Sequence, residues 1–382
     1  MCTAAENGLH QLASEGVSPW LDGLSQEVTA SGQLAHLVSH STLRGTTSNV
    51  DVLAAAVARD WRYHDRLASL AKRNVPVEIA ARSLLTHDAR LACTELRPVF
   101  EAGRDLDGQV SIDVDPALAT DVESTVREAA EISRLVNRSN LLVKIRVTEQ
   151  GIPAIRRCLG TGIGVHAVDV LSEHRYGDVL DAYFDGLELA AAAGVRPSTV
   201  GLVTSLPVGR IDAEFDARLD TIGTAAARAL RGQGALAVAR LTYRVHEQRL
   251  GTERWRALSA AGARPPRLMW TDTTVTDPAY PPTRYVDEFV AWGTASAMSL
   301  STLDAVARGS GLHGDTLTSQ HERAAAVLGE FERIGVSHSA VAGRLDVTSA
   351  GRYADAWWNL RDRVAAQLRS SGWPAACPGT RP

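Results

Sequence analysis

Short apolar segments alternate along the chain with longer segments in which apolar residues recur every three or four positions. The short segments are rich in β-branched residues and end in polar ones, which is typical of strands. The longer segments are rich in alanine, leucine, arginine and glutamate, and we predict helices there over 52–70, 77–101, 119–136, 176–193, 212–233 and 284–291. The predicted strands are 19–24, 45–48, 110–114, 141–145, 165–171, 199–208, 267–271 and a less regular one at 294–298.

This alternation predicts an α/β fold. Eight strand–helix units within about 280 residues favour a single (β/α)8 TIM barrel. The alternative is an open doubly wound sheet, but we find no glycine-rich turn of the G-x-G-x-x-G kind. Residues 160–164 (GTGIG) follow a predicted helix and precede a strand, so we interpret them as a helix C-cap and turn.

After residue 301 the pattern is wholly helical, with predicted helices over 303–307, 321–334, 337–345 and 349–371. We expect these additional C-terminal helices to pack outside the barrel or to cover one of its ends. The prediction is one domain, with the barrel at about 15–300, the helices at about 301–371 and a poorly ordered tail at 372–382.

Composition narrows the class of protein. The 382 residues are 45% hydrophobic and 22% charged, with a formal net charge of −4. No basic block suggests nucleic acid, no apolar run approaches the ~18 residues of a membrane span, and the N-terminus does not resemble a signal peptide. Four widely separated cysteines indicate free thiols and no structural zinc site. We therefore expect a cytoplasmic protein.

Lysine is almost absent: the 40 Lys+Arg residues include only Lys72 and Lys144. Lys144 lies inside an apolar predicted strand, where burial disfavours the ammonium and favours a neutral, nucleophilic amine. Arginine cannot replace it, since it stays protonated and forms no Schiff base. The alternative is an ammonium that reaches past the strand end to water or a carboxylate.

Other polar residues gather at the predicted strand ends, where chemistry sits in a barrel. Each of them alone could be a strand cap or a surface residue. Together with a desolvated lysine they predict a Schiff-base site, in which carboxylates move protons and hydroxyl and amide groups bind substrate hydroxyls. They are Asp22, Ser48, Asn49, Asp113, Arg146, His166, Asp169, Ser205, Arg210 and Asp272.

Six segments resemble motifs of the transaldolase family, in the family's order and over most of the chain. They are SPWLD at 18–22, RGTTSN at 44–49, HDARLACTELRPVF at 87–100, SIDVDP at 111–116, NLLVKIRVT at 140–148, and RLMWTDT at 267–273 followed by DPAY at 277–280.

The resemblance implies that Lys144 attacks the ketone of a ketose phosphate, that retro-aldol cleavage leaves a bound three-carbon enamine, and that this enamine adds to another aldehyde. Asp22 matches the family's acid/base aspartate, and Asn49 matches an asparagine that holds substrate. Ser205 and Arg210 match a serine and a phosphate-binding arginine. The chemistry implies no metal and no cofactor.

The chain departs from the family at its proton relay. The glutamate that helps to hold a proton-shuttling water becomes Asp113, one methylene shorter, and its threonine partner becomes Val168, which cannot hold water. The family's asparagine becomes His166. Strand alternation puts His166 and Val168 on one face and Asp169 on the other. His166 could take over proton transfer, since the reference pKa of imidazole is about 6.5, or simply replace an amide hydrogen bond.

The phosphate side departs as well. Asp272 replaces a serine and would repel a phosphate dianion, and Thr276 replaces a basic residue. Arg146 replaces a proline two residues after Lys144, so it shares a face with the lysine. There it would favour the neutral amine or bind a relocated anionic group.

Three functions remain open on the sequence. The first is a transaldolase-type enzyme that transfers a dihydroxyacetone unit between sugars or sugar phosphates, in a specialised sugar pathway. The second is a Schiff-base aldolase or condensing enzyme for another carbonyl substrate, favoured by Asp272 and Val168. The third is a non-catalytic barrel that binds a sugar or a protein, against which Lys144, Asp22 and Asn49 argue.

Overall fold

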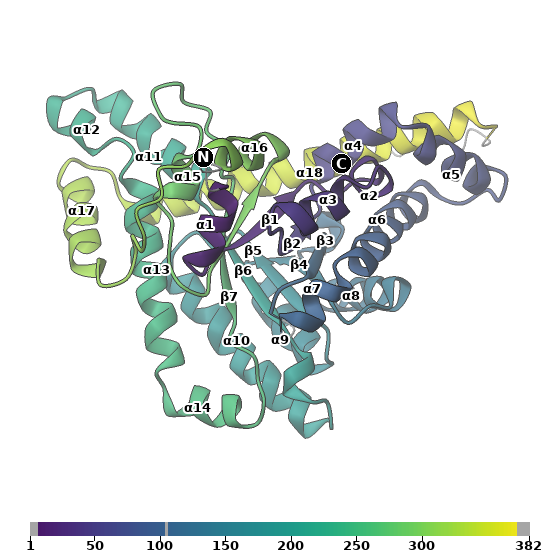
Figure 1. The fold of residues 1–382 in the computed structure, drawn as a ribbon, viewed down its shortest axis with the longest axis horizontal. Helices are drawn as coiled ribbons and strands as arrows, with labels where there is room; N and C mark the ends of the chain where they lie inside the picture. Colours follow the sequence, from purple (N-terminus) through teal and green to yellow (C-terminus); the bar gives the residue numbers. More distant parts are fainter. Residues whose placement is uncertain (1–6, 104–105, 373–382) are drawn as a thin grey trace, which may run out of the picture.

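Eight parallel strands close into a barrel in chain order, which confirms the predicted (β/α)8 fold (Figure 1). The computed structural model describes residues 7–103 and 106–372. Pairing of β1 with both β2 and β8 closes the ring and rules out the open sheet. The strands are β1 Ser18–Asp22, β2 Gly45–Thr47, β3 Gln109–Asp113, β4 Leu141–Arg146, β5 Val165–Val168, β6 Leu202–Pro207, β7 Arg267–Thr271 and β8 Ala295–Met298.

Helices surround the barrel. Those up to β5 are α1 Gly8–Ser14, α2 Gln26–Ala30, α3 Gln33–His40, α4 Val50–Arg59, α5 Trp61–Ala71, α6 Val77–Glu95, α7 Arg97–Ala102, the 3-10 helix η1 Pro116–Leu118, α8 Val122–Val136 and α9 Gly151–Gly160. Those after β5 are α10 Glu173–Ala192, η2 Pro197–Thr199, α11 Val208–Ile222, α12 Ala225–Leu230, α13 Gly234–Leu250, α14 Glu253–Ala260, α15 Arg284–Asp287, α16 Leu300–Arg308, α17 His321–Arg333 and α18 His338–Ser370.

Three predicted helices are each divided in two. Asp60 leaves the helical conformation and its carboxylate accepts the Arg62 N–H, so α5 begins there instead of continuing α4. Gly223, at φ 67°, separates α11 from α12. Pro98 lacks an N–H, and α6 accordingly ends before a separate α7.

The reverse error occurs at the C-terminus, where two predicted helices are one. α18 runs for 33 residues without a break. Leu345 and Ser349 are both buried and four residues apart, so the residues between them continue the same helical face. The GTGIG turn is as predicted: α9 ends at Gly160, and Gly162 has φ 87°.

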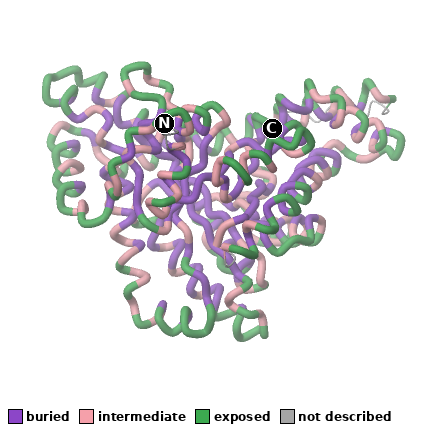
Figure 2. Tube along the Cα trace, in the orientation of Figure 1, coloured by how far each residue is buried: buried purple, intermediate pink, exposed green. Residues whose placement is uncertain are grey.

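Inward-facing residues fill the barrel in layers. In the layer just below the polar carboxyl ends these are apolar: Trp20, Leu142, Val203 and Met269 form one buried cluster with two alanines of β8. Gly45 is required beside them, since a Cβ there would lie 2.3 Å from the Trp20 ring. Figure 2 shows that the strands are buried while the outer helices carry the exposed residues. The apolar layers close the barrel below and leave its carboxyl end for polar side chains.

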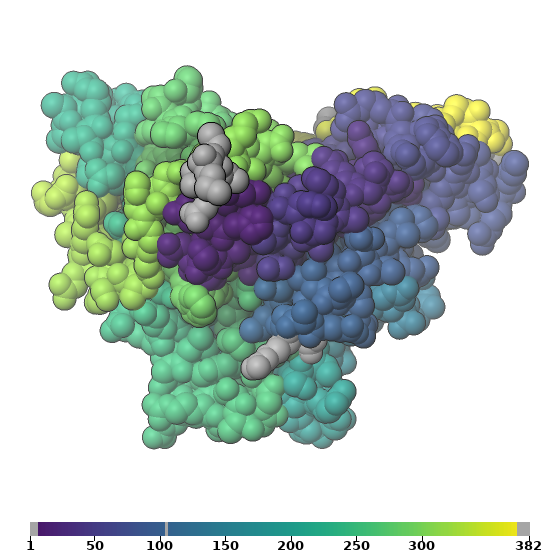
Figure 3. Space-filling view, viewed as in Figure 1, coloured from purple at the N-terminus to yellow at the C-terminus, as the bar shows by residue number. Residues whose placement is uncertain are grey.

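The C-terminal helix α18 covers that carboxyl end. It packs against α4, α5, α6 and α11, and a second buried cluster joins its later residues to α4–α6. In Figure 3 the dark blue α4–α5 region and the yellow end of α18 form a lobe at the upper right of the molecule. Of the two placements expected for the C-terminal helices, α18 therefore shows the one over a barrel end.

Two further expectations concern the cysteines and the membrane. Cys93 and Cys158 are free and buried, as predicted, and burial raises the pKa of each thiol to about 12. Cys2, Cys377 and residues 373–382 of the predicted tail lie outside the described residues. In the described part of the chain, no helix is long and apolar enough to cross a bilayer.

Candidate active site

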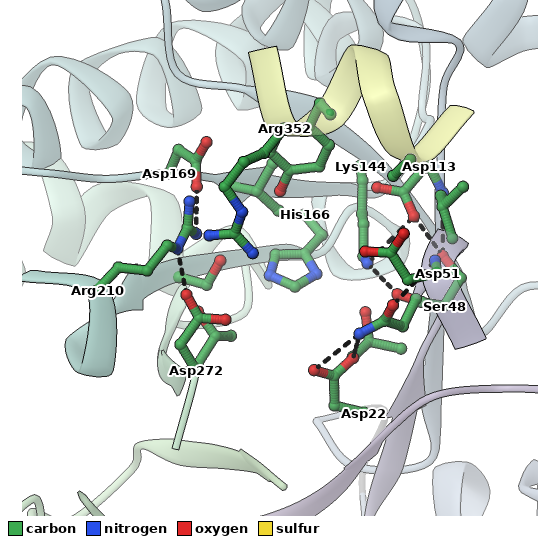
Figure 4. A pocket seen from close by; sticks show the side chains of 18 residues that line it. Asp22, Ser48, Asp51, Asp113, Lys144, His166, Asp169, Arg210, Asp272 and Arg352 are labelled. Carbon is green, nitrogen blue, oxygen red and sulfur yellow. Dashed lines mark hydrogen bonds and ion pairs between the residues drawn. The ribbon is translucent and has the colours of Figure 1, made fainter. Parts of the chain in front are cut away.

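A cavity at the carboxyl end of the barrel brings together most of the predicted site residues. Strand ends form its floor, and Arg352, Tyr353 and Ala356 of α18 form one wall (Figure 4). The predicted residues that line it are Asp22, Ser48, Asn49, Asp113, Lys144, His166, Asp169, Ser205, Arg210 and Asp272.

Lys144 lies between two neighbouring strands. The register pairs Asp113 of β3 with Lys144 of β4, and Lys144 with His166 of β5, so the three residues stand at one level. Lys144 Nζ lies 3.3 Å from Asp113 Oδ2 and also donates to the backbone oxygen of Ser48. The contact of the amine with a carboxylate is the one described by the alternative interpretation of Lys144.

Asp113 is fixed by Ser48. The Ser48 hydroxyl donates to Asp113 Oδ2 at 2.6 Å, the same oxygen that faces Lys144. The backbone N–H of Asp113 donates back to Ser48 Oγ at 3.2 Å. This reciprocal pair sets the carboxylate in direct contact with the amine, where it can exchange a proton with Lys144.

His166 is buried and neutral. Burial, reinforced by the charge of Lys144, holds its pKa well below the usual value. Nδ1 lies 2.9 Å from Ser111 Oγ, whose hydroxyl donates to Thr47. Nδ1 therefore carries the ring proton, and Nε2, which is buried and has no hydrogen-bond partner among the described residues, is left as an acceptor. A neutral ring with this low pKa does not supply a proton near neutral pH.

Asp22 and Asn49 form the opposite side of the cavity. Burial raises the pKa of Asp22 to about 6, although the Lys144 charge works against this shift. Asn49 is the N-cap of α4: its Oδ1 accepts the N–H groups of Asp51 and Val52. That cap turns the amide nitrogen toward Asp22, 3.5 Å from both carboxylate oxygens. Asn49 thus has a structural function and also faces the cavity.

Arg210, in the first turn of α11, is held by two carboxylates. Its Nε pairs with Asp272, its second terminal nitrogen lies 2.9 Å from Asp169 Oδ1, and its first donates to Ser349 of α18 at 2.7 Å. Asp169 was predicted to face away from His166. That prediction is wrong, because Asp169 has φ 61° just beyond β5, and this left-handed turn brings its side chain back to the cavity.

The comparisons with known proteins can be set beside this geometry. Residues 19–364 match the family model described as transaldolase/fructose-6-phosphate aldolase. The chain is similar to Transaldolase 1 of Streptomyces avermitilis, 44% identical over 95% of this chain and 96% of the relative. It is also similar to a transaldolase of Thermobifida fusca, 45% identical over 94% of this chain and 98% of the relative.

The chain belongs to the transaldolase/fructose-6-phosphate aldolase family. The resemblance drawn from the six motifs is thereby confirmed, and the protein is a transaldolase-like transferase. The finer assignments, namely the roles of single residues and the identity of the sugars, are not given by these matches.

Arg146 lies to one side of the cavity of this transaldolase-family barrel. Its Nε is 3.2 Å from Asp169, and one terminal nitrogen is 3.0 Å from Asp346 of α18. Its guanidinium also lies over the Tyr353 ring, 5.6 Å from the centroid. It does not line the main cavity, but it lines a smaller neighbouring one together with Asp113, Lys144 and Tyr353. Its polar contacts are with Asp169 and with α18.

Several cavity residues could not be found from the strand ends. Arg352 and Tyr353 come from α18, about 200 residues after Lys144, and no motif pointed to them. Burial, helped by Asp169 and Asp113, holds the pKa of Tyr353 well above its usual value, so its hydroxyl stays protonated. Ser111 was part of a recognised motif, and its position two residues before Asp113 on one strand face was an available signal.

Proposed function

We propose that the protein transfers a dihydroxyacetone unit from a ketose or ketose phosphate to an aldehyde, through a Schiff base on Lys144. One observation carries the proposal: the amine of a nearly lysine-free chain lies in the family's barrel cavity, beside one carboxylate and across from another. We propose that the protein acts in the cytoplasm, on a small sugar substrate and without a cofactor.

The first step joins Lys144 to the ketone. The ammonium gives a proton to Asp113, and the free amine attacks the carbonyl carbon. The carbinolamine then loses its hydroxyl as water, with the proton that Asp113 holds, and a protonated imine remains. Ser48 holds Asp113 in place and, through its backbone oxygen, Lys144 as well.

The second step breaks the C3–C4 bond. Asp22, as a carboxylate, takes the proton of the C4 hydroxyl, the aldehyde leaves, and the bonding electrons move toward the imine nitrogen to give an enamine. The enamine carbon then attacks a second aldehyde, and Asp22 returns the proton to the new alkoxide. Hydrolysis releases the product and restores Lys144. A pKa of about 6 suits Asp22 both to take up the proton during cleavage and to return it during addition.

The remaining polar groups are proposed to bind substrate. His166 Nε2 is buried and has no hydrogen-bond partner within the described ranges, so it would accept a hydrogen bond from a hydroxyl of the dihydroxyacetone unit. Together with the low pKa, this favours a binding function over proton transfer. Asn49 and Ser205 line the cavity and would bind other hydroxyls. Arg210 and Arg146, which the sequence assigned to substrate, would act mainly by holding α18 over the site.

A second candidate keeps the Schiff base and changes the outcome. Two carboxylates already bind Arg210, the expected phosphate ligand. This favours an aldolase or condensing enzyme for a poorly phosphorylated carbonyl substrate. A non-catalytic barrel is the third candidate, and the pairing of Lys144 with Asp113 argues against it.

Borohydride trapping tests the proposal. The protein is incubated with borohydride and a ketose, phosphorylated or not, and the adduct is located by intact mass and peptide mapping. We expect one dihydroxyacetone-sized adduct on Lys144, lost in Lys144→Ala and kept in Lys72→Ala, the matched removal of the other lysine. Adducts without transfer to erythrose 4-phosphate would favour the second candidate, and no adduct with any ketose would favour the third.

A further inference from the structure

The cavity has an excess of acid over base. Its basic residues are Lys144, Arg210 and Arg352. The five aspartates that line it are Asp22, Asp51, Asp113, Asp169 and Asp272. A phosphorylated substrate is an anion and needs a cation that is not already neutralised. The charges of the cavity therefore decide where such a group could bind.

Two of the three cations are already committed to carboxylates. Lys144 is paired with Asp113 and is reserved for the ketone. Each nitrogen of the Arg210 side chain donates to a protein oxygen, two of them to Asp272 and Asp169. A phosphate at Arg210 would have to compete with both carboxylates, which stand beside it as like charges.

Arg352 is the cation left over. It makes no ion pair or hydrogen bond among the described residues, although five carboxylates share the cavity with it. Figure 4 shows its side chain pointing from α18 into the cavity, with the guanidinium between Arg210 and His166. It is an exposed residue, so its donors remain open to a ligand that enters from the mouth.

We propose that Arg352 binds the terminal phosphate monoester of the sugar substrate, in the place that Arg210 was expected to fill. The planar guanidinium matches two phosphate oxygens, and its position on α18 puts the charged end of the sugar at the mouth while the carbonyl end reaches Lys144. This inference rests on the proposed function and adds the residue of this chain that selects a phosphorylated over an unphosphorylated sugar.

The variant Arg352→Gln tests the inference without threatening the fold, because the side chain is exposed and makes no ion pair or hydrogen bond with the residues that the structure describes. We expect kcat/KM for fructose 6-phosphate to fall about 10- to 100-fold, mainly through KM, the loss of one hydrogen-bonded charge pair. Borohydride trapping of dihydroxyacetone on Lys144 should be unchanged, because dihydroxyacetone has no phosphate. Arg363→Gln, an exposed arginine of the same helix outside the cavity, is the matched control and should behave as wild type.

Binding of inorganic phosphate by calorimetry provides a test independent of catalysis. Wild type and Arg363→Gln should bind it and Arg352→Gln should lose most of the affinity. Equal use of fructose and fructose 6-phosphate by the wild type, or an undiminished phosphate preference in Arg352→Gln, would overturn the inference and leave the Schiff base standing. No trapping with either sugar, together with Arg352-dependent phosphate binding, would instead overturn the proposed function and keep the anion site.

Discussion

Two carboxylates face Lys144 in different surroundings, and this difference suits them to different proton transfers. Asp113 accepts from the Ser48 hydroxyl at 2.6 Å and is paired with the lysine at 3.3 Å. In the described part of the chain the Asp22 carboxylate has the amide of Asn49 at 3.5 Å as its hydrogen-bond partner, and burial raises the pKa of Asp22 to about 6. Asp113 is therefore suited to the proton of the amine, and Asp22 to the proton of the substrate hydroxyl.

The pH dependence of cleavage follows from Asp22. Cleavage needs the carboxylate, and a raised pKa means that the carboxyl is protonated over a wider acid range. We expect kcat/KM to fall about tenfold per pH unit below about 6. Asp22→Asn should lower kcat by roughly 10²- to 10⁴-fold while imine trapping on Lys144 persists. The measurements are a pH–rate profile and borohydride trapping.

His166→Asn is the control for that profile. Because the pKa of His166 lies well below its usual range, His166 does not titrate near pH 6, and the acid limb should stay in place in this variant. An acid limb that moves in His166→Asn, or that survives in Asp22→Asn, would assign the proton transfer to another group.

Single residues of the site could be predicted where strand register alone sets them. Lys144, Asp113 and His166 follow from alternation along three adjacent parallel strands. The direction of the Asp169 side chain could not be predicted, because it depends on a left-handed φ that the sequence pattern does not reveal. Arg352 could not either, since its approach depends on tertiary packing of a distant helix.

At the scale of elements, α18 completes the site. It supplies one cavity wall and is tied to the strand ends by Asp346 and Ser349, which bind Arg146 and Arg210. Buried residues of its second half, including Leu360 at 0% exposure, pack on α4–α6. The position of Arg352 and Tyr353 over the cavity therefore depends on apolar packing farther along the same helix.

Truncation of one buried and of one exposed apolar residue of α18 tests whether this packing holds the cavity wall in place. Leu360→Ala should destabilise the protein by about 2–5 kcal/mol through a buried cavity, and should lower activity as α18 loosens. Val347→Ala, at a position 74% exposed, should change stability by less than about 0.5 kcal/mol. Urea unfolding and hydrogen exchange of α18 give the measurements. Equal effects of the two changes would refute the view that this packing holds the wall in place.

Elements were predictable in kind and less so in extent. All eight strands could be predicted from short apolar runs, because a barrel strand is buried on both faces. Helix ends were harder: Asp60 and Gly223 divide helices through local conformations, whereas the buried face shared by Leu345 and Ser349 joins two predicted helices. Periodicity shows that a helix exists, and capping and packing decide where it stops.

At the scale of the whole molecule, α18 belongs to two of the three buried clusters that the described residues form. One is the cluster with α4–α6, and the other, here called the barrel core, lies between the strands and the surrounding helices. Val341 and Leu345 are part of the barrel core, while Trp357, Leu360 and neighbouring residues are part of the cluster with α4–α6. One continuous helix thus links the barrel to the lobe. We propose on this ground that the barrel and its C-terminal helices are a single domain and unfold together.

Coincident unfolding of the two cores tests this proposal. Cys93 and Cys158 are buried in the barrel core, and burial raises the pKa of both thiols to about 12, so they react with thiol reagents only after that core opens. With Cys2 and Cys377 replaced by serine, thiol labelling follows the barrel, and circular dichroism follows all helices, including those of the lobe. We expect one urea midpoint for both probes, because α18 cannot leave one core without straining the other. If helicity is lost at lower urea than the thiols become reactive, the lobe and α18 unfold separately, and the barrel alone is the folding unit.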